Sequence, residues 1–319
     1  MHHVVFLGTP DFAVPSLEAL TDHPDFDVVG VITQPDRPAG RGQQVRFSPV
    51  KEAALARDLP VFQPKSVNKP DALDQLREWS PDVLVVAAFG QILKPALLEL
   101  APHGSINVHA SLLPRWRGAA PIHRAVAAGD EITGITIMRV VVPLDAGPTL
   151  ATARTPISPD ETSVELEARL AAMGADLLVK TIDRMAGGPI AETPQDDGQA
   201  TYARRLERAD GRVDFDRPAR EIHNAIRGLQ PWPLASAMLH GKRLALLASQ
   251  ARPDEAVTAP PGTIVRVEPD ALVVATGAGA IRLLRVQVEG RPAVATRDFL
   301  NGHPTRAGER LERVPDAST

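Results

Sequence analysis

Short runs of valine, isoleucine and leucine alternate with stretches of helical periodicity over the first part of the chain. The runs HVVFL (3–7), FDVVGVIT (26–33) and DVLVVAA (82–88) have the length and β-branched content of buried strands. Apolar residues recur at helical spacing between these runs, in segments 14–20 and 71–79. Parallel strands need a crossover connection, so this alternation predicts an α/β domain with a mostly parallel sheet.

The middle of the chain continues this pattern and then loses it. We predict strands over 105–109, 131–142 and 150–157, followed by an amphipathic helix over 161–185 that closes the first domain. The next stretch, GGPIAETPQDDGQATY (187–202), has no apolar period and is rich in Gly, Pro, Asp and Gln. Such a composition is typical of a linker.

Beyond the linker the periodicity becomes that of short strands. One helix is predicted over 218–229. Five short strands separated by turn residues follow it, at 235–239, 243–248, 262–267, 272–276 and 281–288. Five strands of this length indicate a small β-barrel. Residues 303–319 are expected to form a frayed tail.

These patterns divide the chain into two domains. We predict a first domain over residues 1–188, a linker over 189–204 and a second domain over 205–319. A chain of 319 residues exceeds the size of one typical core, and its apolar content of 44% is enough for two.

Composition excludes several kinds of site. The chain has no cysteine, so it can form neither a disulfide framework, nor a thiolate zinc site, nor a thiol nucleophile. Its histidines and acidic residues show no metal-ligand spacing, and we expect no metal. No apolar run approaches membrane-spanning length, and the first run reads as a strand rather than a signal peptide. We therefore expect a cytoplasmic protein with no membrane partner.

The turn after the first predicted strand, Gly8 to Phe12, argues against a dinucleotide site. It contains one glycine where the dinucleotide fingerprint has three. An NAD-dependent dehydrogenase is excluded on this ground.

Charge is unevenly distributed along a chain whose net charge is -4. Residues 1–199 carry 17 lysines and arginines against 25 acidic residues, whereas residues 200–319 carry 18 against 14. A positive C-terminal half is compatible with a polyanionic partner and equally with an ordinary solvated surface.

The most informative stretch is HGSINVHASLLPRWRGAAPIHRAV, residues 103–126. Side chains two apart on a strand share a face, so Asn107 and His109 point the same way. They lie near the C-terminal end of their strand, where open α/β sheets place ligands. Pro121 suits the first position of a following helix. An Asn and a His at a strand end are also common turn formers, so spacing alone leaves both interpretations open.

Within this stretch, Asn-Val-His, Ser-Leu-Leu-Pro and Arg-Gly-Ala-Ala-Pro-Ile together resemble the signature of enzymes that use 10-formyltetrahydrofolate, above all the methionyl-tRNA formyltransferase family. The motifs GTPDF, TQPDRPAGRG and TGITIM extend the resemblance over residues 3–300. It implies an N-terminal Rossmann-like formyltransferase domain and a C-terminal OB-like β-barrel. The implied activity is transfer of a formyl group from 10-formyltetrahydrofolate to the amino group of methionyl initiator tRNA, for translation initiation.

The resemblance implies three catalytic residues, Asn107, His109 and Asp145. The Asn107 amide and the His109 ring would donate hydrogen bonds to the oxyanion of a tetrahedral intermediate. Asp145 would orient His109 and help the attacking ammonium lose its proton. The Asp145 loop departs from the family pattern Gly-Leu-Asp-x-Gly-Asp, because Pro143 and Pro148 replace its first Gly and last Asp. Two prolines stiffen the loop, so the position of its carboxylate is open.

Two binding segments also follow from the resemblance. The folate pocket would be lined by Ser111, Leu112, Leu113 and Pro114. The long polar segment 34–51 would contact the acceptor end of the tRNA, with Arg41 as the first candidate residue and Arg37 as the second. We expect folate and methionyl initiator tRNA as the partners of a monomeric enzyme.

Two other functions share part of this pattern. A formyltransferase acting on a sugar-nucleotide amine has the same Asn-Val-His and Ser-Leu-Leu-Pro residues, and a catalytically inactive RNA-binding homologue is compatible with the two loop prolines. The Arg41 segment and the basic second half favour tRNA as the acceptor. The arginines at 115, 117 and 124 lie near enough in sequence to meet either the folate tail or the tRNA end, and their roles stay open.

Overall fold

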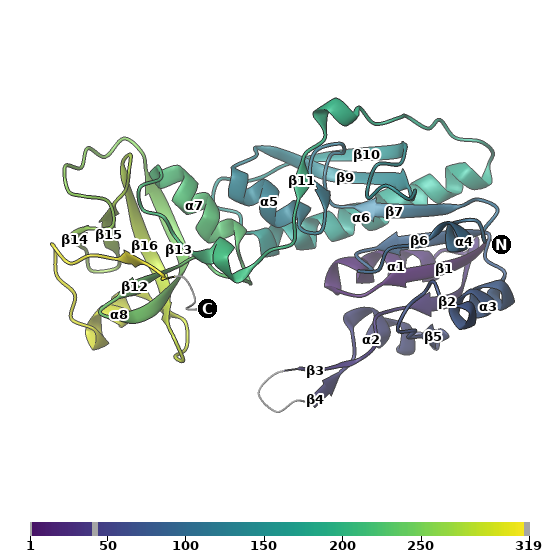
Figure 1. Cartoon of the computed structure of the whole chain (residues 1–319), viewed down its shortest axis with the longest axis horizontal. Helices are drawn as coiled ribbons and strands as arrows, with labels where there is room; N and C mark the ends of the chain where they lie inside the picture. Colours follow the sequence, from purple (N-terminus) through teal and green to yellow (C-terminus); the bar gives the residue numbers. More distant parts are fainter. Residues whose placement is uncertain (1, 40–43, 316–319) are drawn as a thin grey trace. The chain divides into compact units, whose positions relative to one another are not determined.

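The computed structural model describes residues 2–39 and 44–315 and divides the chain into two compact units (Figure 1). Unit 1 comprises Met1–Pro121, Ile132–Thr155 and Glu167–Ala203. Unit 2 comprises Ile122–Glu131, Pro156–Leu166 and Arg204–Thr319. Within the described residues, no helix is long and apolar enough to cross a membrane.

Unit 1 is built on a seven-stranded sheet, and the predicted Rossmann-like architecture with a mostly parallel sheet is confirmed. In spatial order the strands are β10 (Thr149–Pro156), β9 (Ile132–Arg139), β7 (Ser105–His109), β6 (Val83–Ala87), β1 (His2–Gly8), β2 (Phe26–Ile32) and β5 (Val61–Phe62). The pairs from β7 to β5 are parallel, whereas β9 runs antiparallel to β7. The strand order reverses at β1 and β6, which places the ligand crevice of such sheets at their carboxyl ends.

Proline begins most of the helices of unit 1. Four of them carry Pro at the first or second position: α1 (Val14–Thr21), α2 (Pro49–Leu55), α3 (Pro70–Trp79) and α4 (Pro95–Leu98). Proline fits there because its fixed φ is helical and the missing N–H has no helical partner. The segments 14–20 and 71–79 were predicted as helices, and both are confirmed. A short 3-10 turn, η1 (Asp11–Ala13), precedes α1.

The two faces of the sheet have different roles. Val5, Leu7 and Leu84 pack on one face with side chains of α3 and α4. On the other face, Val108 of β7 packs against α6 (Ser163–Ala186), where a Cβ added to Gly174 would lie 2.9 Å from the valine. Asn107 and His109 alternate with Val108, so they point to the face opposite α6.

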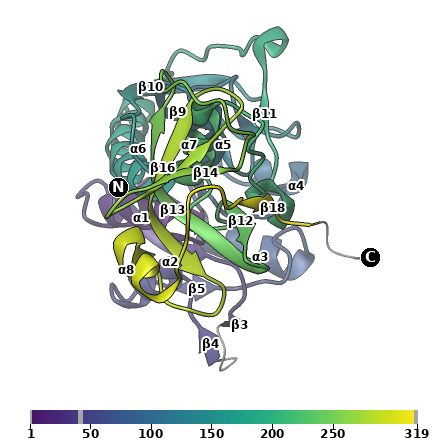
Figure 2. The ribbon, with the colours of Figure 1, turned by 90° about the vertical axis from the view of Figure 1, so that its left-hand side faces the viewer.

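Unit 2 is an antiparallel sheet with the order β14-β15-β16-β13-β12-β18, to which β17 adds by pairing with β16. Its elements are α7 (Ala219–Gly228), β12 (Ser236–Leu239), β13 (Lys242–Arg252), β14 (Ile264–Val267), β15 (Leu272–Ala275), β16 (Ala280–Val288), β17 (Val294–Ala295), α8 (Thr296–Gly302) and β18 (Glu312–Arg313). The five predicted strands and the helix are confirmed. Figure 2 shows the strands curling, with α8 in yellow at one end. Earlier segments of the chain also belong to this unit, including most of α5 (Pro121–Ala128).

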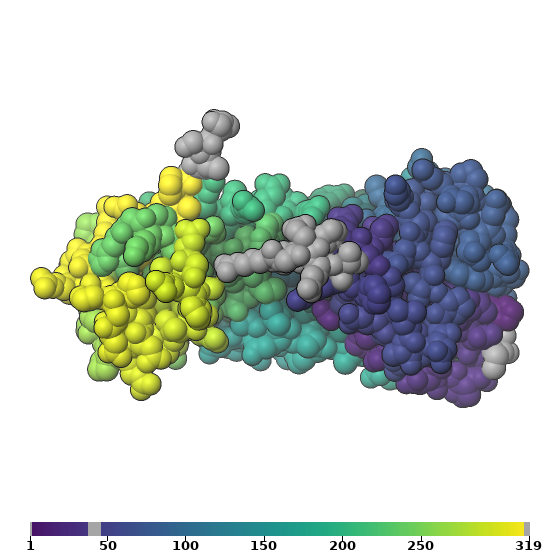
Figure 3. Space-filling view, turned by 90° about the horizontal axis from the view of Figure 1, so that it is seen from below, coloured from purple at the N-terminus to yellow at the C-terminus, as the bar shows by residue number. Residues whose placement is uncertain are grey.

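The prediction of a frayed tail over 303–319 is wrong for part of that segment. Gly308 donates a backbone hydrogen bond to Ile264, Leu311 donates one to Gly262, and the side chain of Leu311 is 1% exposed. One isolated leucine gives no period, which is why the sequence pattern did not indicate a strand. The C-terminal residues described form part of the surface of unit 2 (Figure 3, yellow).

Candidate active site

The centre of the site is the approach of Asp145 to His109. Oδ2 of Asp145 lies 3.8 Å from Nδ1 of His109, and both side chains are largely buried, with exposed fractions of 12% and 6%. The same Oδ2 accepts a hydrogen bond of 2.8 Å from the backbone N–H of Gly118. The carboxylate therefore faces the imidazole even though prolines occupy positions 143 and 148.

The orientation of the His109 ring follows from its second contact. Its Nε2 lies 2.9 Å from the carbonyl oxygen of Trp116. A carbonyl oxygen can only accept, so the hydrogen of this contact is assigned to Nε2. Nδ1 is therefore the ring nitrogen that faces the carboxylate and is free for a reacting group.

The loop that carries Asp145 has an unusual backbone. Asp145 adopts a left-handed conformation, with φ of 51°. Two residues later the chain passes so close to β9 that a Cβ at Gly147 would lie 2.0 Å from the carbonyl oxygen of Arg139. Only glycine fits at such an approach. The loop thus bends back from the end of β9 and turns the Asp145 carboxylate toward His109.

Asn107 lies on the same face of β7 as His109, as the alternation predicted. Its side chain is half-buried, and none of the residues that the structure describes hydrogen-bonds to its amide. An amide carries two N–H donors, so this one remains available to an oxygen atom of a ligand.

The Ser111–Pro114 segment forms a tight loop directly after β7. Thr136, a fully buried residue of β9, donates its hydroxyl to the carbonyl oxygen of Ser111 at 2.7 Å and accepts the N–H of Leu113 at 3.2 Å. These bonds fix the backbone while the side chains of Leu112 and Leu113 remain half-buried. The loop can therefore present apolar surface beside the site.

The sequence patterns did not indicate a segment that contacts both the Asp145 loop and residues 117–118. The stretch from 193 to 203, within the expected linker, contains η2 (Asp197–Gln199) and β11 (Tyr202–Ala203). β11 pairs in parallel with β8 (Arg117–Gly118), and the side chain of Gln195 contacts the Asp145 loop. This stretch has no apolar period, so the sequence pattern predicted no helix or strand in it. The Arg117 side chain is buried there, with 4% exposed.

The described ends of the candidate tRNA segment, residues 34–51, include a short pair of strands. β3 (Arg37–Ala39) pairs antiparallel with β4 (Gln44–Arg46), where the sequence predicted only a long connection. Lys51 pairs with Asp36 at 2.5 Å, and the hydrogen bonds from Lys51 and then Gln63 hold the pKa of Asp36 below its usual value. Arg37 is exposed, and Arg41 lies outside the described residues.

Two family models cover most of the chain. The model described as formyl transferase matches residues 1–182, and the model described as formyl transferase, C-terminal domain, matches residues 205–304. The methionyl-tRNA formyltransferase of Solibacter usitatus is 48% identical over 309 residues, which are 97% of this chain and 98% of that protein. The enzyme of the same name from Symbiobacterium thermophilum is 47% identical over 98% of this chain and 95% of its own length.

The chain belongs to the methionyl-tRNA formyltransferase family. The resemblance seen in its sequence motifs is thereby confirmed, and with it the enzyme class, a one-carbon group transferase. The two family models leave residues 183–204 between them, the region that contains Gln195.

Solved structures share the fold at low sequence identity. The N-formyltransferase of Helicobacter canadensis, in a complex described with folinic acid and dTDP-3-aminofucose, aligns with a TM-score of 0.67 at 19% identity over 89% of this chain and 99% of its own. HypX of Aquifex aeolicus, described in complex with tetrahydrofolic acid, aligns with a TM-score of 0.61 at 15% identity. That match covers 94% of this chain and 47% of HypX, so this chain spans about half of that protein.

No metal centre is found in the described part of the chain. Across residues 2–39 and 44–315, no three His, Cys, Asp or Glu side chains gather in a way that could hold a metal ion.

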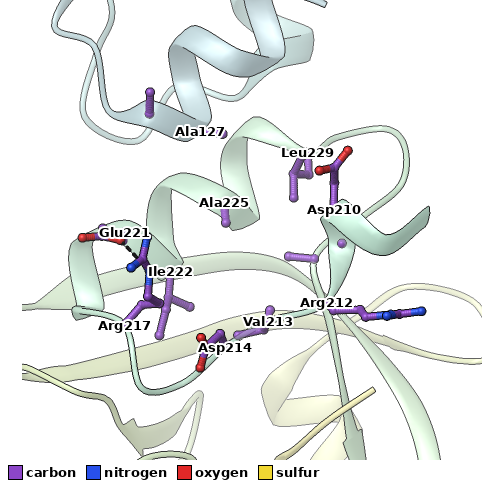
Figure 4. Close-up of a pocket in the computed structure, with 13 residues that line it drawn as sticks. Ala127, Asp210, Arg212, Val213, Asp214, Arg217, Glu221, Ile222, Ala225 and Leu229 are labelled. Atoms are coloured by element: carbon purple, nitrogen blue, oxygen red, sulfur yellow. Dashed lines mark ion pairs between the residues drawn. The ribbon is translucent and has the colours of Figure 1, made fainter. Parts of the chain in front are cut away.

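A separate cavity of about 500 Å³ lies within unit 2 (Figure 4). Ile222 and Ala225 of α7 line it together with Val213. Its ionisable groups include Arg217 and Glu221, which pair at 3.0 Å. Asp210 also lines it and is paired with Arg124 at 2.8 Å. Both apolar and charged residues line the cavity, and the charged groups named here form ion pairs within the protein.

Proposed function

We propose that this chain transfers the formyl group of 10-formyltetrahydrofolate to the amino group of methionyl initiator tRNA. The observation that carries the proposal is the approach of Asp145 to His109, on the strand face that also carries Asn107, in a chain that matches methionyl-tRNA formyltransferases over nearly its whole length. The folate is a substrate that donates the formyl group.

The proposed chemistry passes through a tetrahedral intermediate. The amine nitrogen bonds to the formyl carbon, the formyl oxygen takes a negative charge, and the bond from that carbon to the folate N10 then breaks. Asn107 would donate a hydrogen bond to the oxygen, and Nδ1 of His109 would donate another when the ring is doubly protonated, because Nε2 already donates to Trp116. The attacking ammonium must release protons while the departing N10 takes one, and Asp145 would accept a proton beside His109.

We assign folate contact to the Ser111–Pro114 loop. The half-buried Leu112 and Leu113 would meet the flat pterin, and the Thr136 hydrogen bonds would hold the loop in place for it. A rigid loop loses little conformational entropy when a ligand binds.

We assign tRNA contact to Arg41, to Arg37 of β3 and to residues 205–319. The ion pair between Lys51 and Asp36, the residue before β3, supports the assignment of Arg37, because an exposed guanidinium on a fixed strand is suited to phosphate. Catalysis and folate binding would reside in residues 1–188, which residues 189–204 join to the second domain.

We further propose that the sheet of unit 2 is an OB-like barrel that contacts tRNA. We also propose that the enzyme acts as a monomer. The barrel is supported by residues 308–313, which hydrogen-bond to the start of β14 on one side and, through β18, to β12 on the other. The monomeric state can be checked by sedimentation of the purified chain with and without tRNA.

The acceptor can be tested directly. Purified protein is incubated with 10-formyltetrahydrofolate and either methionyl initiator tRNA or a nucleotide-linked amino sugar. The proposal predicts formyl transfer to the methionyl-tRNA alone. Transfer to the sugar would instead make the chain a sugar-nucleotide formyltransferase. Binding of tRNA with transfer to neither acceptor would make it an inactive RNA-binding homologue.

A further inference from the structure

Gln195 is a half-buried residue between exposed neighbours in the segment that follows α6. Its Nε2 donates to two carbonyl oxygens of the catalytic loop, that of Asp145 at 2.8 Å and that of Gly147 at 2.7 Å. Its Oε1 accepts from Nε and Nη2 of Arg117 at 3.1 and 2.9 Å. Both ends of the amide are therefore engaged, and its orientation is fixed by the donor or acceptor nature of each partner.

Gln195 belongs to a strap, residues 193–203, that runs beside both supporting loops of the site. At one end Thr193 exchanges backbone hydrogen bonds of 2.8 and 2.9 Å with Thr149, just after the Asp145 loop. At the other end Arg117 donates its N–H to Thr201, and Ala119 donates its N–H to Ala203. The strap thus connects the Asp145 loop to the 116–118 loop, which itself contacts His109 and Asp145.

The Asp145 loop needs such external support. Asp145 is in a left-handed conformation, which an L residue with a Cβ adopts only at a cost. The N–H of Gly118 holds its carboxylate. Among the described residues, the backbone oxygens of Asp145 and Gly147 accept side-chain hydrogen bonds from Gln195 alone.

We propose that Gln195 is a positioning residue for formyl transfer, which holds the backbone of Asp145 so that its carboxylate faces His109. The inference rests on the proposed function of the site. The hydrogen bonds of the Gln195 side chain to the described residues reach Arg117 and the backbone oxygens of Asp145 and Gly147, so it acts through the loop. Arg117 fixes the Gln195 amide from the other side.

Two variants of Gln195 separate positioning from packing. Gln195→Glu keeps the shape and can still accept from Arg117, but it places an oxygen where the amide N–H groups meet two carbonyl oxygens. Gln195→Ala removes all four contacts. Gln199→Ala is the matched control, because Gln199 lies in the same strap and, among the described residues, its Nε2 bonds only to Asp196. The full chain is used throughout, with kcat and KM measured for both substrates and thermal melting measured for each variant.

We expect kcat to fall about 10- to 100-fold in both Gln195 variants, with KM for both substrates nearly unchanged. Gln199→Ala should keep the kcat of the unaltered protein. A Gln195→Glu variant with unaltered kcat would overturn the inference, as would losses that only follow the unfolded fraction seen by melting.

A crystal structure of Gln195→Ala provides a readout that does not depend on activity. The inference predicts an Asp145 Oδ2 to His109 Nδ1 separation longer than 3.8 Å or a disordered loop. An unmoved carboxylate would contradict it. If the unaltered protein transfers no formyl group, the proposed function fails, whereas a displaced Asp145 would still show that Gln195 sets its position.

Discussion

The carboxylate of Asp145 and the imidazole of His109 are both held by one short loop. Gly118 binds Oδ2 of Asp145 through its N–H, and Trp116 binds Nε2 of His109 through its carbonyl oxygen. A displacement of this loop would therefore move both groups together. This shared support suits the proposed reaction, because an oxyanion donor and a proton acceptor must keep their relative positions as charge develops.

Replacing Asn107 with alanine should slow the reaction without unfolding the protein. The amide forms no hydrogen bond with the described residues, so its removal leaves no buried group unpaired. Loss of one oxyanion donor typically lowers turnover about 10²- to 10³-fold. Steady-state kcat and thermal melting of the variant beside the unaltered protein check this. A variant of Asn107 that melts early but turns over normally would refute the assignment.

Thr136→Val should affect both stability and folate use. The hydroxyl serves Ser111 and Leu113, and an isosteric valine leaves a buried carbonyl and N–H unpaired. We expect the free energy of unfolding to fall by about 1–3 kcal/mol and KM for 10-formyltetrahydrofolate to rise. Denaturant unfolding and kinetics measure the two effects. Thr181→Val, another buried threonine whose hydroxyl bonds within α6, should leave the folate KM unchanged.

Removing the charge of Arg37 or of Arg41 should weaken tRNA use and spare folate binding. Arg37→Ala and Arg41→Ala each remove a charge proposed to meet phosphate. KM for the tRNA should rise, and the slope of log affinity against log salt should become shallower by about one unit. The exposed Arg77→Ala on α3 is the control. Equal loss of folate and tRNA binding would contradict the assignment.

Unit 2 should lose stability as the pH falls. Burial, the largest effect, lowers the pKa of both His123 and His223. His223 bonds to Ser249 and to the carbonyl oxygen of Pro159, with Asp160 and Arg227 nearby.

A buried histidine with a lowered pKa takes up its proton more readily in the unfolded chain. The contribution of these histidines to the free energy of unfolding is therefore fully present above their unfolded pKa, about 6.5, and decreases as the pH falls below it. Denaturant unfolding between pH 8 and pH 5 measures this change. His223→Gln should reduce the pH dependence, and an unchanged slope would contradict the account.

The parts of the fold that could be predicted from the sequence are those in which apolar residues recur at a regular spacing. Alternation placed Asn107 and His109 on one face of β7, and the Val-rich runs predicted the parallel sheet. The position of Asp145 could not be predicted from the sequence, because it depends on a left-handed backbone and on contacts from Gly118 and Gln195, which are distant in sequence.

Local pattern also missed elements that form only through partners. β8 and β11 are two residues each and exist because they pair with each other. β18 likewise depends on β12. Single residues such as Gln195 and Leu311 give no periodic signal, so their burial appears only in the folded chain.

The central claim is that Asp145 assists transfer of the formyl group at a carbon held beside Asn107 and His109. A single-turnover measurement of labelled formyl transfer to methionyl initiator tRNA, with Asp145→Asn beside the unaltered protein, tests it most directly. The asparagine can still accept the N–H of Gly118, so the fold should be kept while proton transfer is lost. We predict a rate at least about 100-fold lower in the variant. Transfer by Asp145→Asn at the unaltered rate would contradict the account.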